Sequence, residues 1–325
     1  MSIDYFYLSI KILNIMKNFK FFFAAFMLLA ASCSNEESLD SSVNLSNEQA
    51  QAPVTVSVSG FAVGQEEFPD ASGGTTRGTT RATAVSDYTS VKFLTLAFYK
   101  SDGTEQFKVT QNRDDATTFT TFGEFSTSLP LGSYTMVVLG YVLYDDDELT
   151  LTSPTEAEYT VGAPRETFAA TQVVNVTSTT ALNLSATLNR IVSQLKVISS
   201  DNRTENVSNV RMTFAAGGKR FSPTTGLATV NTGFSNTVGI STDVGAKSGS
   251  ISNIFLASDE QDIDVTIETL DADGNTIFTK TVEDVPFKRN RITKLTGALY
   301  DVSASATAGS FEVNTEWLSD YSDTF

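Results

Sequence analysis

The chain has 325 residues and carries 22 Lys and Arg against 38 Asp and Glu, a net charge of −16 at pH 7. This acidic balance repels phosphate backbones and anionic lipid surfaces, so it argues against nucleic-acid binding. The sequence has no His and a single Cys. These counts exclude imidazole catalysis, an intrachain disulfide and the usual Cys/His zinc sites.

Residues 1–32 have the pattern of a secretory signal peptide. The segment from Met16 to Lys20 is basic, and residues 21–29 are apolar but too few to cross a bilayer comfortably. Residues 1–14 fit the front of such a signal poorly, because Asp4 and several polar residues interrupt them. The sequence therefore leaves open whether translation starts at Met1 or at Met16. In either case we expect nothing before Cys33 in the mature protein.

Cys33 follows the small residues Ala30, Ala31 and Ser32 at the end of the apolar segment. This arrangement resembles the lipobox of bacterial lipoproteins, although Ala30 stands where that pattern prefers Leu. The resemblance implies that the protein is a lipoprotein, with a fatty acid such as palmitate attached at Cys33. A buried thiol without a role is the alternative interpretation.

Residues 33–53 contain almost no bulky apolar side chain and predict an acidic, flexible tether. Its first residues, from Ser34 to Glu37, are similar to the acidic signal that sends Bacteroidetes lipoproteins to the outer face of the outer membrane. That similarity implies a surface-exposed protein of the cell outer membrane.

Residues 54–63 predict the first β-strand of the protein. Val54, Val56 and Val58 alternate with small polar residues, as in a strand with one buried face. Gly60 predicts a bulge, after which Phe61 and Val63 lie on the other phase.

Residues 65–87 follow this strand and predict an exposed loop. They are mostly small and polar, and they contain a near-repeat of Thr-Thr-Arg that ends in Arg77 and in Arg81. Such a loop has little apolar surface to bury and is open to proteases. From the residues alone, the two arginines are either solvated charges or a processing site.

From Ser90 onward, apolar segments of strand length alternate with tight-turn signals. Ser101-Asp102-Gly103 and Asp271 to Asn275 each predict a hairpin turn. Ser133 to Tyr144 predicts a central strand, and the carboxylates from Asp145 to Glu148 predict a solvated turn, since the ligand spacing of a calcium loop is absent. We expect an all-β protein with two antiparallel β-sandwich domains, 54–185 and 186–325, joined near 181–188.

We find no pattern that predicts an enzyme. Ser193 and Lys196 have the Ser-x-x-Lys spacing of some acyl enzymes, but the polar partners of that mechanism are absent. No pair of carboxylates stands in the context of a hydrolase. We therefore expect neither catalysis, nor a cofactor, nor a metal. The tail from Ser310 to Leu318 is either a strand that docks on another subunit or the last strand of its own domain.

Three short motifs carry a resemblance over nearly the whole mature chain. They are Leu129-Pro130-Leu131-Gly132-Ser133-Tyr134-Thr135, Leu188-Asn189-Arg190-Ile191-Val192 and Arg289-Asn290-Arg291-Ile292-Thr293-Lys294-Leu295-Thr296-Gly297. With the lipobox, the chain resembles the Bacteroidetes fimbrillins, the FimA-like subunits of type V pili. The resemblance implies two tandem transthyretin-like β-sandwich domains after a lipoprotein signal and a flexible tether. It also implies that an Arg-specific protease removes the first strand and that a strand of a neighbouring subunit replaces it.

Carried onto this sequence, the resemblance makes Cys33 the lipid anchor, Arg77 or Arg81 the cut, and Val54 to Val63 the released strand. It implies a structural or accessory subunit of a fimbria that serves surface adhesion. Its partners are then other pilus subunits, an Arg-specific protease and, for the precursor, the outer membrane. The alternative is a surface glycan-binding lipoprotein, which should show more exposed aromatic residues than the single Trp of this chain.

Overall fold

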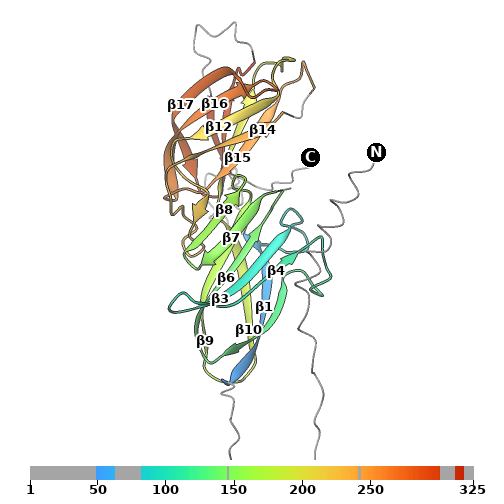
Figure 1. Cartoon of the computed structure of the whole chain (residues 1–325), viewed down its shortest axis with the longest axis vertical. Coiled ribbons are helices and arrows are strands. Elements are labelled where there is room, and N and C mark those ends of the chain that lie inside the picture. The colour runs from blue at the N-terminus through green and yellow to red at the C-terminus, as the bar shows by residue number, and fades with distance from the viewer. Residues whose placement is uncertain (1–48, 63–81, 145, 241–242, 301–311, 318–325) are drawn as a thin grey trace, which may run out of the picture. The chain divides into compact units, whose positions relative to one another are not determined.

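The computed structural model describes residues 49–62, 82–144, 146–240, 243–300 and the backbone of residues 312–317. Strands dominate these residues, and the fold is all-β and built of β-sandwiches, as the sequence predicts (Figure 1). None of the described residues belongs to a helix that could cross a membrane. The predicted signal peptide, Cys33, Arg77 and Arg81 lie outside the described residues.

The first sandwich is one eight-stranded sheet that folds over on itself. Its strand order is β2-β1-β10-β9-β6-β3-β4, and β5 pairs with β1. The strands β9 and β10 pair only through residues 168–169 and 189–190, so they form the corner between two layers. The strands are β1 (Gln51–Ala62), β2 (Ala82–Thr83), β3 (Phe93–Lys100), β4 (Glu105–Asn112), β5 (Glu124–Pro130), β6 (Gly132–Tyr141), β9 (Thr167–Val176) and β10 (Leu182–Arg190).

The strands β3 and β6 are buried on both faces. Leu96 and Met136 point into the core of the first sandwich, whereas Ala97 and Val137 belong to a second apolar cluster on the opposite face. That cluster includes side chains of a small sheet made of β7 (Glu148–Ser153), β8 (Glu156–Val161) and β13 (Arg220–Phe221). Burial on both faces explains the continuous apolar run of β6, which the sequence correctly predicts as a central strand.

Two four-stranded sheets enclose the core of the second sandwich. One has the order β15-β11-β18-β19 and the other β14-β12-β16-β17. The strands are β11 (Ser193–Ser199), β12 (Asn209–Phe214), β14 (Phe234–Gly239), β15 (Gly249–Ile254), β16 (Glu260–Leu270), β17 (Thr276–Lys288), β18 (Arg291–Gly297) and β19 (Glu312–Trp317). The tail strand β19 pairs antiparallel with β18, so its backbone completes a sheet of its own chain.

The structure differs from the predicted joint at 181–188. Residues 182–188 belong to β10, which continues to Arg190 and pairs with β1 up to Asn189. Ala186 and Leu188 are buried in the first core, and this burial holds the strand in the first sheet beyond the predicted boundary at 185/186. The passage to the second sandwich is the short link of Ile191 and Val192 before β11.

Both predicted hairpin turns are confirmed. Gly103 has a φ of 83° between β3 and β4, and Gly274 has a φ of 85° between β16 and β17. In the second turn, the Asp271 carboxylate accepts hydrogen bonds from the side-chain amide of Asn275 and from the backbone amides of Asn275 and Asp273, and these bonds lower the pKa of Asp271. Within the described part of the chain, no acidic cluster is arranged to hold a metal ion.

Candidate functional site: the first strand and its groove

Strand β1 lies between two neighbours and is paired on both sides. It runs parallel to β10 from Val54 to Ala62, and its first half runs antiparallel to β5 from Gln51 to Ser57. Loss of β1 would therefore leave two rows of backbone N–H and C=O groups without partners. Such open edges bind another strand readily.

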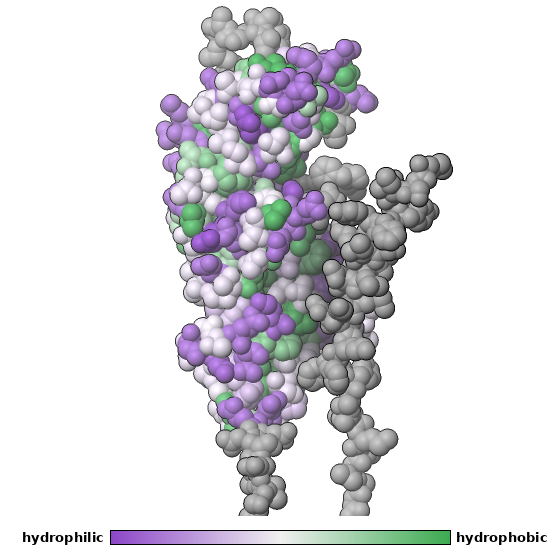
Figure 2. Space-filling view, in the orientation of Figure 1, coloured by the Kyte–Doolittle hydropathy of each residue, from purple (hydrophilic) through white to green (hydrophobic). Residues whose placement is uncertain are grey.

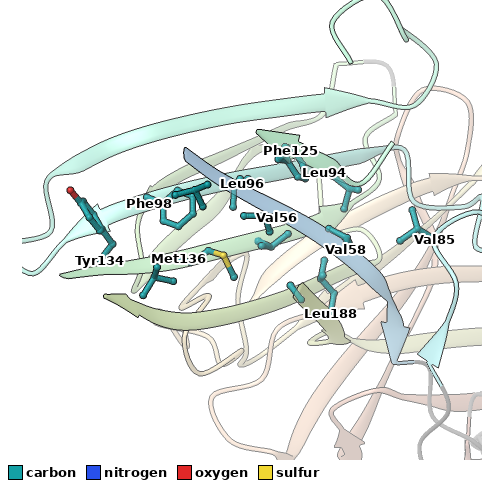
Figure 3. Close-up of a cluster of buried hydrophobic side chains, with 14 of the residues drawn as sticks. Val56, Val58, Val85, Leu94, Leu96, Phe98, Phe125, Tyr134, Met136 and Leu188 are labelled. Carbon is teal, nitrogen blue, oxygen red and sulfur yellow. The ribbon is translucent and has the colours of Figure 1, made fainter. Parts of the chain in front are cut away.

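The inward face of β1 forms part of the first core. Ala52, Val54 and Val56 are fully buried, and Val58 is nearly so. Figure 3 shows Val56 and Val58 on β1 facing a layer of aliphatic and aromatic side chains from the other strands. Leu94, Leu96, Phe98 and Met136 come from β3 and β6, and Phe125 and Leu188 come from β5 and β10, which pair with β1 on its two edges. The apolar face of β1 thus fills a groove lined by these side chains.

The predicted bulge at Gly60 is confirmed. The pairing of β1 with β10 shifts register between Val58 and Gly60. A Cβ atom added to Gly60 would lie 2.4 Å from the carbonyl oxygen of Thr83 in β2, so only glycine allows this close approach. Beyond the bulge, Phe61 returns to the core and is fully buried.

The outward face of β1 makes exposed side-chain hydrogen bonds and one half-buried bond, from the Ser59 hydroxyl to the carbonyl of Ala186 over 3.1 Å. Thr55 donates to Asn183 over 2.5 Å, Ser57 donates to Glu124 over 2.5 Å, and Ser59 lies 2.8 Å from the hydroxyl of Thr187. Exposed bonds of this kind contribute little because water competes for the same groups. Backbone pairing and the apolar inward face therefore hold β1 in place.

Residues 85–91, where the predicted loop ends, are held by the side chain of Arg113. Arg113 donates hydrogen bonds to the carbonyls of Val91, Val85 and Tyr88 over 2.9, 3.0 and 3.2 Å, and its guanidinium lies 4.1 Å from the ring centroid of Phe122. Partial burial lowers the pKa of Arg113. These contacts do not involve β1, so residues 85–91 can keep their place when β1 is absent.

The predicted exposed loop 65–87 is wrong at its carboxyl end. Ala82 and Thr83 form β2, which pairs with Ala62 and Phe61 of β1, and the Val85 side chain is buried. The strand β2 has only two residues, and its pairing with β1 occurs at the close approach to Gly60. A sequence pattern does not reveal such a contact.

Ser193 and Lys196, whose spacing matches that of some acyl enzymes, are not brought together by the fold. Ser193 and Lys196 lie on strand β11, where residues three apart point to opposite faces. The Ser193 hydroxyl donates to the carbonyl of Arg291 over 3.3 Å.

Two of the three motifs meet in the structure. Arg190 of the second motif donates a hydrogen bond from Nη1 to Oδ1 of Asn290 in the third motif over 2.9 Å. The first motif forms the end of β5 and the start of β6, where Leu129 pairs with Ala52 of β1. Sequence reasoning missed Tyr88 and Glu166, which bond to the Arg190 side chain, since no spacing in the sequence connects them.

A model of the family of unknown function DUF6562 matches residues 52–322. The chain therefore belongs to that family. No curated protein matches the sequence.

Several solved structures of Bacteroidetes proteins are similar to this chain. One is a "putative adhesin" from Bacteroides ovatus, with 13% identity, a TM-score of 0.47, and 82% of this chain and 92% of that one covered. Another is a "putative cell adhesion protein" from Bacteroides eggerthii, with 11% identity, a TM-score of 0.46, and 83% and 97% covered. A third is the fimbrial anchor protein Mfa2 from Porphyromonas gingivalis, with 11% identity, a TM-score of 0.43, and 81% and 97% covered.

Proposed function

We propose that this chain is the lipoprotein precursor of a type V pilus subunit that assembles by strand exchange and serves surface adhesion. The observation that carries the proposal is the placement of β1: the strand fills an apolar groove, is paired on both edges, and directly precedes the segment with Arg77 and Arg81. One cut in that segment separates β1 from the rest of the chain, while no other described strand of the first sheet is detached.

The energetics of β1 explain why an exchanged strand would bind tightly. Burial of Val54, Val56, Val58 and Phe61 stabilises the fold by about 6 to 12 kcal/mol, at roughly 1.5 to 3 kcal/mol for each side chain. This is comparable to the whole stability of a domain. A strand from a second subunit that restores the apolar contacts and the backbone ladders recovers this free energy. Such a contact is head-to-tail and does not close, so it extends into a filament.

The position of β2 favours Arg77 over Arg81 as the first bond to be cut. The peptide bond after Arg81 is followed at once by Ala82 and Thr83, which are paired with β1. A protease binds locally extended, unpaired backbone, so a cut after Arg81 requires β2 to open first. Arg77 lies further from that pairing in the sequence.

The surface of the described residues suits a precursor that stays soluble until it is cut. Figure 2 shows hydrophilic residues spread over the visible face, with hydrophobic residues in small separate spots. The net charge of −16 adds mutual repulsion between copies. We infer that the precursor reaches the outer membrane with its lipid on Cys33 and joins other pilus subunits only after an Arg-specific protease has acted.

The amino terminus of the assembled protein tests this processing. We expect N-terminal sequencing of the filament fraction to begin at Gly78 or at Ala82, because a cut after Arg77 or Arg81 removes everything before those residues. The membrane fraction of cells that lack the protease supplies the control and should retain a blocked Cys33. Filaments whose subunits still begin at Cys33 would contradict removal of β1.

Lipidation is tested independently of assembly. Because Cys33 is the only thiol of the chain, we expect Cys33→Ala to abolish incorporation of radiolabelled fatty acid completely. Ser32→Ala, which changes the neighbouring residue and keeps the thiol, is the matched control. Label that still enters the Cys33→Ala protein would overturn the assignment of the anchor.

A further inference from the structure

A buried ionic cluster lies where the two sandwiches join. The Glu166 carboxylate accepts hydrogen bonds from the Tyr88 hydroxyl over 2.6 Å, from Nε of Arg190 over 2.9 Å and from the Ser90 hydroxyl over 3.2 Å. Arg190 is only 4% exposed and also donates from Nη2 to the Tyr88 oxygen over 2.7 Å. Burial, with the Glu166 charge adding to it, raises the pKa of Tyr88, so the phenol stays a neutral donor.

The same guanidinium reaches into the second sandwich. Nη1 of Arg190 donates to the side-chain Oδ1 of Asn290, in the turn between β17 and β18. The backbone N–H of Asn290 donates to the carbonyl of Val192 over 2.9 Å. Asn290 has a φ of 59°, a left-handed conformation that Asn and Gly adopt most easily. Arg190 thus bonds residues of the first sandwich and a turn of the second at once.

Strand β1 covers this cluster with one aromatic ring. The Phe61 centroid lies 5.3 Å from that of Tyr88 and 4.9 Å from that of Phe168, and the Arg190 guanidinium lies 5.0 Å from the Phe168 centroid. Phe61 itself is fully buried. Without its ring, water reaches the Tyr88 and Phe168 side of the cluster, raises the local dielectric and weakens the bonds of Arg190 to its partners.

We propose that Phe61 is a positioning residue through which β1 controls the rigidity of the junction between the two sandwiches. With β1 in place, the covered ion pair holds Arg190 on Asn290 and fixes the β17–β18 turn. When β1 leaves, the Arg190–Asn290 bond opens and the turn loosens. The inference goes beyond the proposed function, because the contact of Phe61 with the cluster is tested on the uncut chain, without lipid, protease or filament.

Hydrogen exchange of the chain from Cys33 to Phe325 tests the proposal. We expect Phe61→Ala to speed exchange of the Asn290 amide about tenfold, while amides of β11 that report global opening of the second sandwich stay unchanged. Val56→Ala is the matched control: it removes a fully buried side chain of the same strand, but one that pairs with Leu184 and Phe125, away from the cluster. Phe61→Leu should restore most of the protection, since it keeps an apolar cover.

Asn290→Gly separates coupling from a general loss of stability. Glycine keeps the left-handed backbone and removes only the side-chain acceptor of Arg190. In this background we expect Phe61→Ala to cause no further increase in exchange at residue 290. The proposal is overturned if Phe61→Ala leaves the backbone amide of Asn290 protected, or if Val56→Ala speeds its exchange equally. It is also overturned if the factors by which Phe61→Ala and Asn290→Gly each raise the exchange rate at residue 290 multiply in the double variant.

Discussion

Replacing both Arg77 and Arg81 by Ala is expected to give a folded monomer that does not enter filaments. The loop bond stays intact, so β1 keeps its backbone pairing with β10 and β5 and its apolar face stays in the groove. A strand of the same chain competes at a very high effective concentration, which a donor strand of another subunit cannot match. Filament formation after treatment with an Arg-specific protease, followed by electron microscopy, measures the effect, and we expect complete loss.

Single and charge-preserving variants sharpen this test. Arg77→Lys with Arg81→Lys keeps both charges and should block assembly as fully as the Ala pair, because the protease requires Arg. If β2 protects the bond after Arg81, Arg77→Ala alone should slow cutting several-fold, whereas Arg81→Ala alone should have a smaller effect. A double Ala variant that assembles as readily as the parent would exclude strand exchange, and the glycan-binding lipoprotein would then be the better account.

A chain that begins at Ala82 is expected to lose cooperative folding of the first sandwich. It lacks the burial worth about 6 to 12 kcal/mol that β1 supplies, which is as large as the stability of a typical domain. Thermal unfolding followed by circular dichroism should show no transition for this sandwich, or aggregation through the open edges. A strand that binds in place of β1 restores this burial, and the hydrogen bonds of Arg113 to Val91 and Val85 do not depend on β1 itself.

A synthetic peptide of residues 49–62 should restore the transition. A peptide with Val54→Asp and Val56→Asp should fail, because it would bury two unpaired charges. A peptide with Thr55→Ala and Ser57→Ala is the control and should still bind, since the hydrogen bonds of those side chains to Asn183 and Glu124 are exposed. If the chain from Ala82 is as stable as the parent without any peptide, β1 is not the strand that completes this fold.

The sequence alone determined the fold class and the buried face of the first strand, although β1 begins at Gln51, inside the predicted tether 33–53. Alternation of Val54, Val56 and Val58 with small polar residues defines one buried face whatever the strand packs against, because side chains of a strand point to opposite faces in turn. Turn residues are equally local: Gly103 and Asp271 form hairpins through their own backbone and side-chain bonds. The short apolar segments between such turns left no room for long helices.

Only the tertiary structure decided where the first sandwich ends and what joins it to the second. The residues 181–188 have no break in their pattern that could show which sheet they enter. The parallel pairing with β1, more than a hundred residues away, assigns residues 182–188 to β10. The same holds for Arg190 and Asn290, which are separated by 100 residues and meet through folding. Contacts of this length depend on the packing of both sandwiches, and a single sequence carries no local signal for them.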